Sequence, residues 1–179
     1  GVELLDKYGV IALMYAASNG KVECVSALLA AGAGVDLRDN DGVSALMYAA
    51  SYDKVECVSA LLAAGASVDL QNNNGWTALM YAASNGKVEC VSALLAAGAR
   101  VDLQVRVGWP ALTYAASHGK VECGSALLAA GARAVGRDKE GRRARMLAAE
   151  EGTEGCGSAL HAAGACDDDD GNTCAETYL

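Results

Sequence analysis

A stretch of 13 residues, KVECVSALLAAGA, occurs three times without a change, at 21–33, 54–66 and 87–99, and once more at 120–132 with Gly124 in place of valine. Glycines repeat with the same period of 33 residues, at Gly9, Gly42, Gly75, Gly108 and Gly141 and again at Gly32, Gly65, Gly98, Gly131 and Gly164. A fixed period of roughly 20 to 50 residues is typical of stacked repeat proteins. The sequence therefore predicts five units, 6–38, 39–71, 72–104, 105–137 and 138–170. We interpret 1–5 as the remnant of a preceding unit, ending its second helix, and 171–179 as a frayed C-terminal remnant.

The third unit indicates how each unit is built. Thr77 can cap a helix that begins at Ala78 and ends before Asn85-Gly86, a dipeptide that breaks helices. A second helix is predicted from Val88 to Ala96, because apolar residues recur there at helical spacing. Gly98 follows where a left-handed helix end is favoured. The remaining residues are extended and end in a glycine turn, so each unit is predicted to be helix, turn, helix and hairpin.

This pattern resembles the ankyrin repeat, whose unit has the same length and the order Asp-x-x-Gly-x-Thr-Pro-Leu-His, an Ala-Ala helix and a Leu-Leu helix ending in Gly-Ala. The matching residues of the second unit are Asp39, Gly42, Ser44, Leu46, Ala49, Ala50, Leu61, Leu62, Gly65 and Ala66. The resemblance implies an all-α solenoid of stacked helix-turn-helix units with short β-hairpin fingers, and it covers 1–170.

The chain departs from the family pattern in the first helix and in the last unit. Three units have Ala-Leu-Met in place of Pro-Leu-His, and Pro110 stands at the Thr site of the fourth. The methionines Met14, Met47, Met80 and Met146 are expected to pack where the family has histidine. In unit five, Arg145 and His161 replace leucines, which fits a terminal unit with a polar outer face.

Charge and hydropathy exclude two classes of partner. The formal net charge is −8, whereas binding to nucleic-acid phosphates needs clustered Lys and Arg. The cluster Arg133, Arg137, Lys139, Arg142, Arg143 and Arg145 is the one exception, and we interpret it as a solvated face. No apolar run approaches the roughly 18 residues of a membrane-spanning helix. We therefore expect neither a nucleic-acid nor a membrane partner.

Five of the seven cysteines follow the period. They are Cys24, Cys57, Cys90, Cys123 and Cys156. Stacked helices lie about 8 to 10 Å apart, too far for disulfides between neighbours, and no spacing resembles a zinc site. We predict reduced, buried thiols, no metal, and a reducing, cytoplasmic location. Cys166 and Cys174 are the only pair that we would test for oxidation or metal capture.

The sequence contains no motif of a known catalytic class. Nucleophile-elbow, phosphate-loop, zinc-protease and kinase patterns do not occur in it. The glutamates Glu23, Glu56, Glu89 and Glu122 repeat with the period, so we assign them to the scaffold, at helix starts where a carboxylate is favourable. We expect no enzyme activity and no cofactor.

Recognition is expected at residues that differ between units, because the identical residues form the shared scaffold. In ankyrin repeats these positions line the concave face and the hairpin fingers where partner proteins dock. The predicted partner-binding residues are Tyr8, Asn19, Asp41, Val43, Tyr52, Asn74, Trp76, Asn85, Arg106, Trp109 and His118. Two tryptophans on consecutive fingers suit an interface hot spot; the alternative is that their rings pack against each other and against neighbouring hairpins.

The resemblance implies a monomeric scaffold that binds a protein partner. The alternative is a non-catalytic targeting or adaptor module of a larger enzyme, such as a kinase or a ubiquitin-ligase component.

Overall fold

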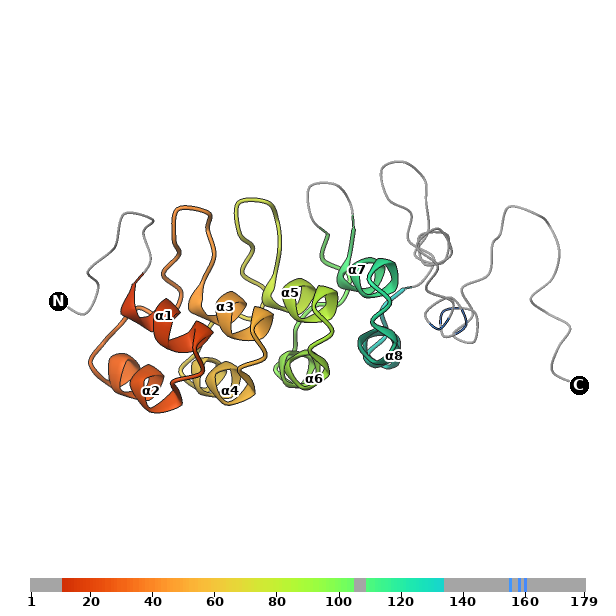
Figure 1. The fold of residues 1–179 in the computed structure, drawn as a ribbon. Helices are drawn as coiled ribbons and strands as arrows, with labels where there is room; N and C mark the ends of the chain where they lie inside the picture. The colour runs from red at the N-terminus through yellow and green to blue at the C-terminus, as the bar shows by residue number, and fades with distance from the viewer. Residues whose placement is uncertain (1–10, 105–108, 134–154, 156–157, 159, 161–179) are drawn as a thin grey trace, which may run out of the picture.

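The computed structural model describes residues 11–104, 109–133, 155, 158 and 160, and eight helices in this part of the chain form four stacked pairs (Figure 1). The first helices of the pairs are α1 (Ala12–Ser18), α3 (Ala45–Ser51), α5 (Ala78–Ser84) and α7 (Ala111–Ser117). The second helices are α2 (Val22–Ala30), α4 (Val55–Ala63), α6 (Val88–Ala96) and α8 (Val121–Ala129). The predicted all-α solenoid of helix-turn-helix units is confirmed.

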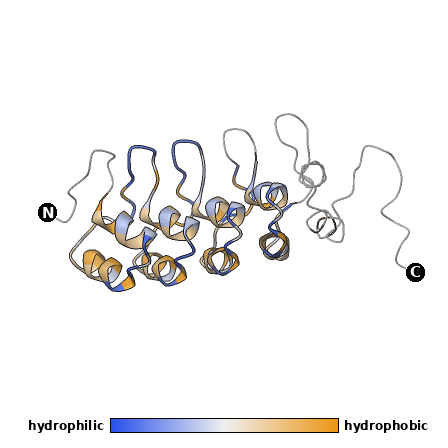
Figure 2. Ribbon diagram, in the orientation of Figure 1, coloured by the Kyte–Doolittle hydropathy of each residue, from blue (hydrophilic) through white to orange (hydrophobic). Residues whose placement is uncertain are grey.

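The helices lie in two rows. We call α1, α3, α5 and α7 the inner row and α2, α4, α6 and α8 the outer row; each helix packs against its neighbours in the row and against its partner in the pair. The loops that join one pair to the next extend beyond the inner row (Figure 1). Hydrophilic residues gather in these loops, whereas the outer row is mostly hydrophobic (Figure 2). The apolar outer row therefore serves stacking, and the loops face water.

Local signals decide where the helices begin and end. The hydroxyl of Thr77 accepts a hydrogen bond from the backbone N–H of Met80 at 3.3 Å, and Ser44 does the same one unit earlier. The predicted second helix of unit three has the bounds that the structure gives α6. Gly98, just beyond it, has φ +86°, the left-handed conformation that glycine adopts without strain.

The core lies between the two rows and consists mainly of Ala, Val and Leu side chains. Met14, Met47 and Met80 are each only 1% exposed, so the expectation that methionine packs at the family's histidine position is confirmed for them. Met146 lies outside the described residues. Because the core continues from each unit to the next, the stability of one pair depends on its neighbours.

The same hydrogen bond joins successive units at three junctions. In each case a carboxylate in the segment after an outer helix accepts from a backbone N–H of the next unit. The pairs are Asp36 with Ser67, Asp69 with Arg100, and Asp102 with Arg133. Repetition of this bond fixes one unit relative to the next in the same way each time.

The β-hairpin fingers are not confirmed. Between units one and two, a single antiparallel bridge joins Arg38 to Ser44, and the described residues contain no longer strand. The loop is instead closed by hydrogen bonds from the N–H of Asp39 to the carbonyl of Val43 and from the N–H of Gly42 to the carbonyl of Asp39. The described loop between units one and two therefore projects as a turn and not as a pair of hydrogen-bonded strands.

The two ends of the predicted array lie mainly outside the described residues. This holds for 1–5 and 171–179, for Arg145 and for His161. One period after 1–5, residues 34–38 form turns and the isolated bridge rather than a helix. In unit five, the side chain of Leu160 is 2% exposed and therefore belongs to the core.

One of the cysteines predicted to be buried is exposed. Cys57, Cys90 and Cys123 are buried as predicted, but Cys24 is exposed. In the later units, the preceding helix pair covers the side of the unit that carries the cysteine. In unit one the same side is a hollow of about 730 Å³, lined by Ala12, Tyr15, Ala16, Asn19, Lys21, Cys24, Ala27 and Leu28. Cys24 is thus exposed by its place in the stack, since its sequence surroundings are those of Cys57. Cys156, Cys166 and Cys174 lie outside the described residues.

Where the structure describes the chain, none of its helices has the length and apolar character needed to span a bilayer.

Candidate functional site

Four of the predicted binding residues form one exposed line along the inner row. Each stands immediately after an inner helix, at its C-terminal end, and each is exposed to solvent. They are Asn19 after α1, Tyr52 after α3, Asn85 after α5 and His118 after α7. The stack therefore presents asparagine at this place in units one and three, tyrosine in unit two and histidine in unit four.

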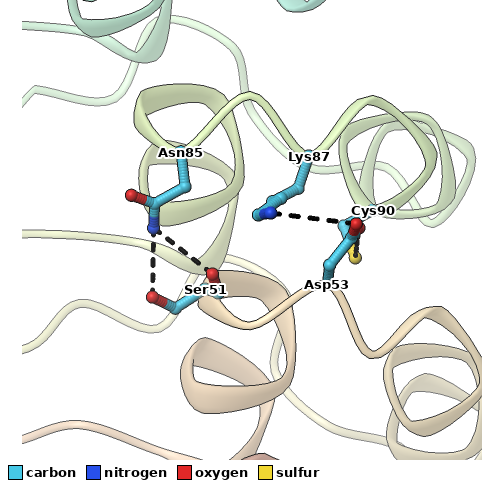
Figure 3. Close-up of polar contacts among 5 residues, drawn as sticks. All are labelled: Ser51, Asp53, Asn85, Lys87 and Cys90. Atoms are coloured by element: carbon cyan, nitrogen blue, oxygen red, sulfur yellow. Dashed lines mark hydrogen bonds and ion pairs between the residues drawn. The ribbon is translucent and has the colours of Figure 1, made fainter.

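Hydrogen bonds hold three of these side chains in defined positions. The amide nitrogen of Asn19 donates to the carbonyl of Tyr15 at 2.8 Å, and Nδ1 of His118 lies 2.9 Å from the carbonyl of Tyr114. Asn85 instead donates to Ser51 of the preceding unit, with 3.1 Å to its hydroxyl (Figure 3). Tyr52 differs from them in size and is 57% exposed.

A carboxylate or amide at the base of the loop organises the backbone and reaches an inner-row tyrosine. Asp39 accepts the N–H groups of Asp41 and Val43, each at 2.9 Å, and the hydroxyl of Tyr48 at 2.7 Å. Burial first, and then the bond to Asp39, raise the pKa of Tyr48. This hydrogen bond joins the base of the loop to α3.

Unit three repeats this arrangement with neutral groups. The side chain of Asn72 accepts the N–H groups of Asn74 and Trp76 and donates to the hydroxyl of Tyr81 at 2.9 Å. The tyrosines were not among the predicted site residues, because they are identical in four units. A spacing of nine residues between Asp or Asn and Tyr, present in the sequence of units one, two and three, was the signal that could have identified them.

The remaining predicted residues of the loops differ in exposure. Asp41 and Asn74 are exposed at equivalent positions, whereas Val43 is half-buried. Tyr8 and Arg106 lie outside the described residues.

The tryptophans are half-buried and pack on tyrosines of the inner row. The ring centroid of Trp76 lies 5.0 Å from that of Tyr81 and 4.4 Å from that of Tyr114, and Trp109 lies 5.4 Å from Tyr114. Tyr114 is 8% exposed. The two indoles therefore meet through this tyrosine, and much of their surface serves packing between units three and four.

A pocket of about 440 Å³ opens between units one and two. Its lining consists of Met14, Tyr15, Ser18, Asn19, Tyr48 and Tyr52, all from α1, α3 and the ends of these helices. Tyr15 is 54% exposed. Two of the lining residues, Asn19 and Tyr52, were predicted to bind a partner; the structure brings them together with two tyrosines that sequence variation could not indicate.

Asp53, the residue after Tyr52, connects units two and three. It occupies a turn position where the other described units have glycine. Its φ is +61°, and no other non-glycine residue in the described part of the chain has a positive φ. Its carboxylate lies 3.9 Å from Nζ of Lys87 and 3.7 Å from Sγ of Cys90 (Figure 3). Burial, followed by the charge and hydrogen bond of Asp53, raises the pKa of Cys90 to about 12. This thiol is therefore held in its protonated, unreactive form.

In the parts of the chain with described coordinates, no group of three or more His, Cys, Asp or Glu side chains is placed to hold a metal ion.

A comparison with family models agrees with the geometry. The model described as ankyrin repeats in three copies matches residues 1–72 and 56–138. A search of curated proteins found no match. Ankyrin repeats are in general protein–protein interaction modules and are typically non-catalytic. Because the matches together span well over half of the chain and the described units stack as helix pairs, the protein belongs to the ankyrin repeat family.

Proposed function

We propose that this chain is a non-catalytic scaffold that binds a partner protein along the inner row and the loops between units. The observation that carries the proposal is the exposed line Asn19, Tyr52, Asn85 and His118, which places three different kinds of side chain on four nearly identical units. Residues that vary on a constant frame are suited to recognition, whereas the repeated outer helices are needed for stacking.

The loops support the proposal because they are ordered before a partner arrives. The N–H of Asn73 donates to the carbonyl of Asp41 at 3.0 Å, and the amide of Asn73 donates to the carbonyl of Asn40 at 3.0 Å. Successive loops are thus bonded to each other. A surface that is already ordered loses less conformational entropy on association.

Site-resolved crosslinking tests this proposal. A photo-crosslinking phenylalanine derivative is placed at Tyr52, and in a matched chain at Ser59, which is exposed on α4 of the same unit. Irradiation in a cell extract should attach a protein to the first chain and not to the second. Crosslinking at Ser59 alone, or equal crosslinking at both sites, would contradict a binding surface along the inner row.

We further propose that the protein functions in a reducing, cytoplasmic compartment. The thiols of Cys57, Cys90 and Cys123 are buried and form no disulfide, which supports this location. Imaging of a fluorescent fusion tests it, and a secreted or lumenal signal would contradict it.

A further inference from the structure

The pocket between α1 and α3 is an aromatic site whose walls come from two units. Tyr15 belongs to α1, Tyr48 to α3, and Tyr52 follows α3 at its C-terminal end. Tyr15 and Tyr52 are each more than half exposed, at 54% and 57%. Pockets of about 300 Å³ and more accept small ligands, so this pocket can take a long side chain of a bound protein.

Negative charge borders the pocket on the loop side. The hydroxyl of Tyr48 donates to the carboxylate of Asp39, and Asp41 is exposed two residues further along the same loop. The charges of both aspartates add to the effect of burial in raising the pKa of Tyr48, which means that their potential reaches this ring. A hydrogen bond to a carboxylate also polarises the phenol and makes its ring a better partner for a cation.

The described lining of the pocket contains no positively charged side chain that would repel a bound cation. None of its described lining residues is Lys or Arg. Lys54 lies across Gly20, since a Cβ built on that glycine would come within 2.9 Å of the lysine stem, and it is not part of the lining. An anionic ligand would be repelled by Asp39 and Asp41, whereas a cation would be attracted.

The equivalent place one unit later lacks the pair of carboxylates. Asn85 stands where unit two has Tyr52, and Asn72 and Asn74 stand in place of the two aspartates. The amide of Asn85 is bonded to Ser51. The residues equivalent to the pocket lining at the later place are Met47, Tyr48, Ser51, Tyr52, Tyr81 and Asn85. That place also has three tyrosines, so the pair of carboxylates is what distinguishes the pocket between units one and two.

We propose that the pocket lined by Tyr15, Tyr48 and Tyr52 binds an arginine or lysine side chain of the partner protein. The cation lies against the tyrosine rings, where cation–π attraction operates within about 6 Å of a ring centre, and its charge is complementary to Asp39 and Asp41. This inference rests on the proposed protein-binding function and specifies the chemistry of the segment that this part of the surface accepts.

The experiment is a titration with a minimal probe, N-acetyl-arginine amide, followed by NMR of a chain labelled in its tyrosine rings. The matched control probe is N-acetyl-citrulline amide, which has nearly the same shape without the charge. The ring signals of Tyr15, Tyr48 and Tyr52 should shift in a saturable way with the arginine probe, while Tyr81 stays unchanged. The citrulline probe should bind about five-fold more weakly or worse, a difference typical of one cation–π contact.

Two substitutions complete the test. Tyr52→Asn introduces the residue that units one and three tolerate at this position, and it should weaken the arginine probe several-fold without changing the helical circular dichroism. Ser59→Asn, at an exposed position of α4 in the same unit, should leave the affinity unchanged. Equal shifts with both probes, or full retention of binding in Tyr52→Asn, would overturn the inference.

The titration and the crosslinking experiment can fail independently of each other. Crosslinking of a protein through position 52 together with no charge-dependent titration would retain the scaffold function and reject the cation site. A charge-dependent titration without any crosslinked protein would retain the site and reject the function proposed for the surface.

Discussion

At the scale of single residues, the repeated cysteine shows that position in the stack decides chemistry. Cys24 and Cys57 lie in identical stretches, yet the first is exposed and the second buried. Burial and, as a smaller effect, the charge of Glu56 raise the pKa of Cys57. The same local sequence therefore produces an accessible thiol in unit one and an inert one in unit two.

We predict that Cys24 is alkylated at least about ten-fold faster than Cys57, Cys90 or Cys123, because an exposed thiol needs no opening of the fold to react. Trypsin releases the four cysteines in distinguishable peptides, since the residues after each repeated stretch differ. Mass spectrometry after short exposure to iodoacetamide measures the four rates separately. Equal rates would show that the outer row opens freely in solution.

The raised pKa of Cys90 predicts a specific loss of stability in alkali. Its ordinary value is 9.0 and its value in the fold is about 12. Between these values the unfolded chain releases the proton while the folded chain retains it, so the free energy of unfolding falls as pH rises. Below pH 9 both states are protonated and this contribution is constant.

Cys90→Ala isolates this effect, because the tyrosines that also titrate in alkali are common to both chains. Urea unfolding from pH 8 to 11 should show that the advantage of the wild type over Cys90→Ala shrinks above pH 9. A difference that stays constant over this range would contradict the role assigned to burial and to Asp53.

At the scale of helices, the sequence predicted what depends on neighbouring residues in the chain. The bounds of α6, the cap at Thr77 and the left-handed Gly98 were all predicted correctly, because each depends on a few adjacent residues. The predicted hairpins are not confirmed, and the described residues contain a single bridge, since strand pairing depends on how two loop segments meet. For the proposed site, variation between units pointed to Tyr52 but could not indicate Tyr48, because this tyrosine is identical in four units.

The cap of α5 gives a prediction at this scale. Thr77→Val keeps the shape of the side chain but removes the acceptor for the buried N–H of Met80, and it should lower the free energy of unfolding by about 1 kcal/mol. Thr77→Ser retains the hydroxyl and should cost less. Urea titration followed by circular dichroism measures both. A smaller loss for Thr77→Val than for Thr77→Ser would show that the cap contributes little.

At the scale of the whole molecule, stability comes from contacts between successive units. Leu61 in α4 is fully buried, while Leu28, its counterpart in α2, is only partly buried and lines the open side of unit one. The surrounding helix sequence is identical, so any difference between the two sites reflects the preceding unit alone.

We predict that Leu61→Ala lowers the free energy of unfolding by about 2–5 kcal/mol, as in other buried leucine truncations. Leu28→Ala should cost about 1–2 kcal/mol, because fewer contacts are lost. Both values come from urea unfolding of the full chain. Equal losses would mean that unit one is covered in solution to the same extent as unit two.

The most direct measurement of the central claim compares partner capture by two double variants. Tyr52→Asn with His118→Asn makes the line along the inner row uniform, whereas Ser59→Asn with Ser125→Asn changes exposed residues of the outer row. With helical circular dichroism unchanged in both, the account predicts that the first variant loses the protein captured by the wild-type chain and that the second retains it. Retention by the first variant and loss by the second would contradict recognition through the inner row.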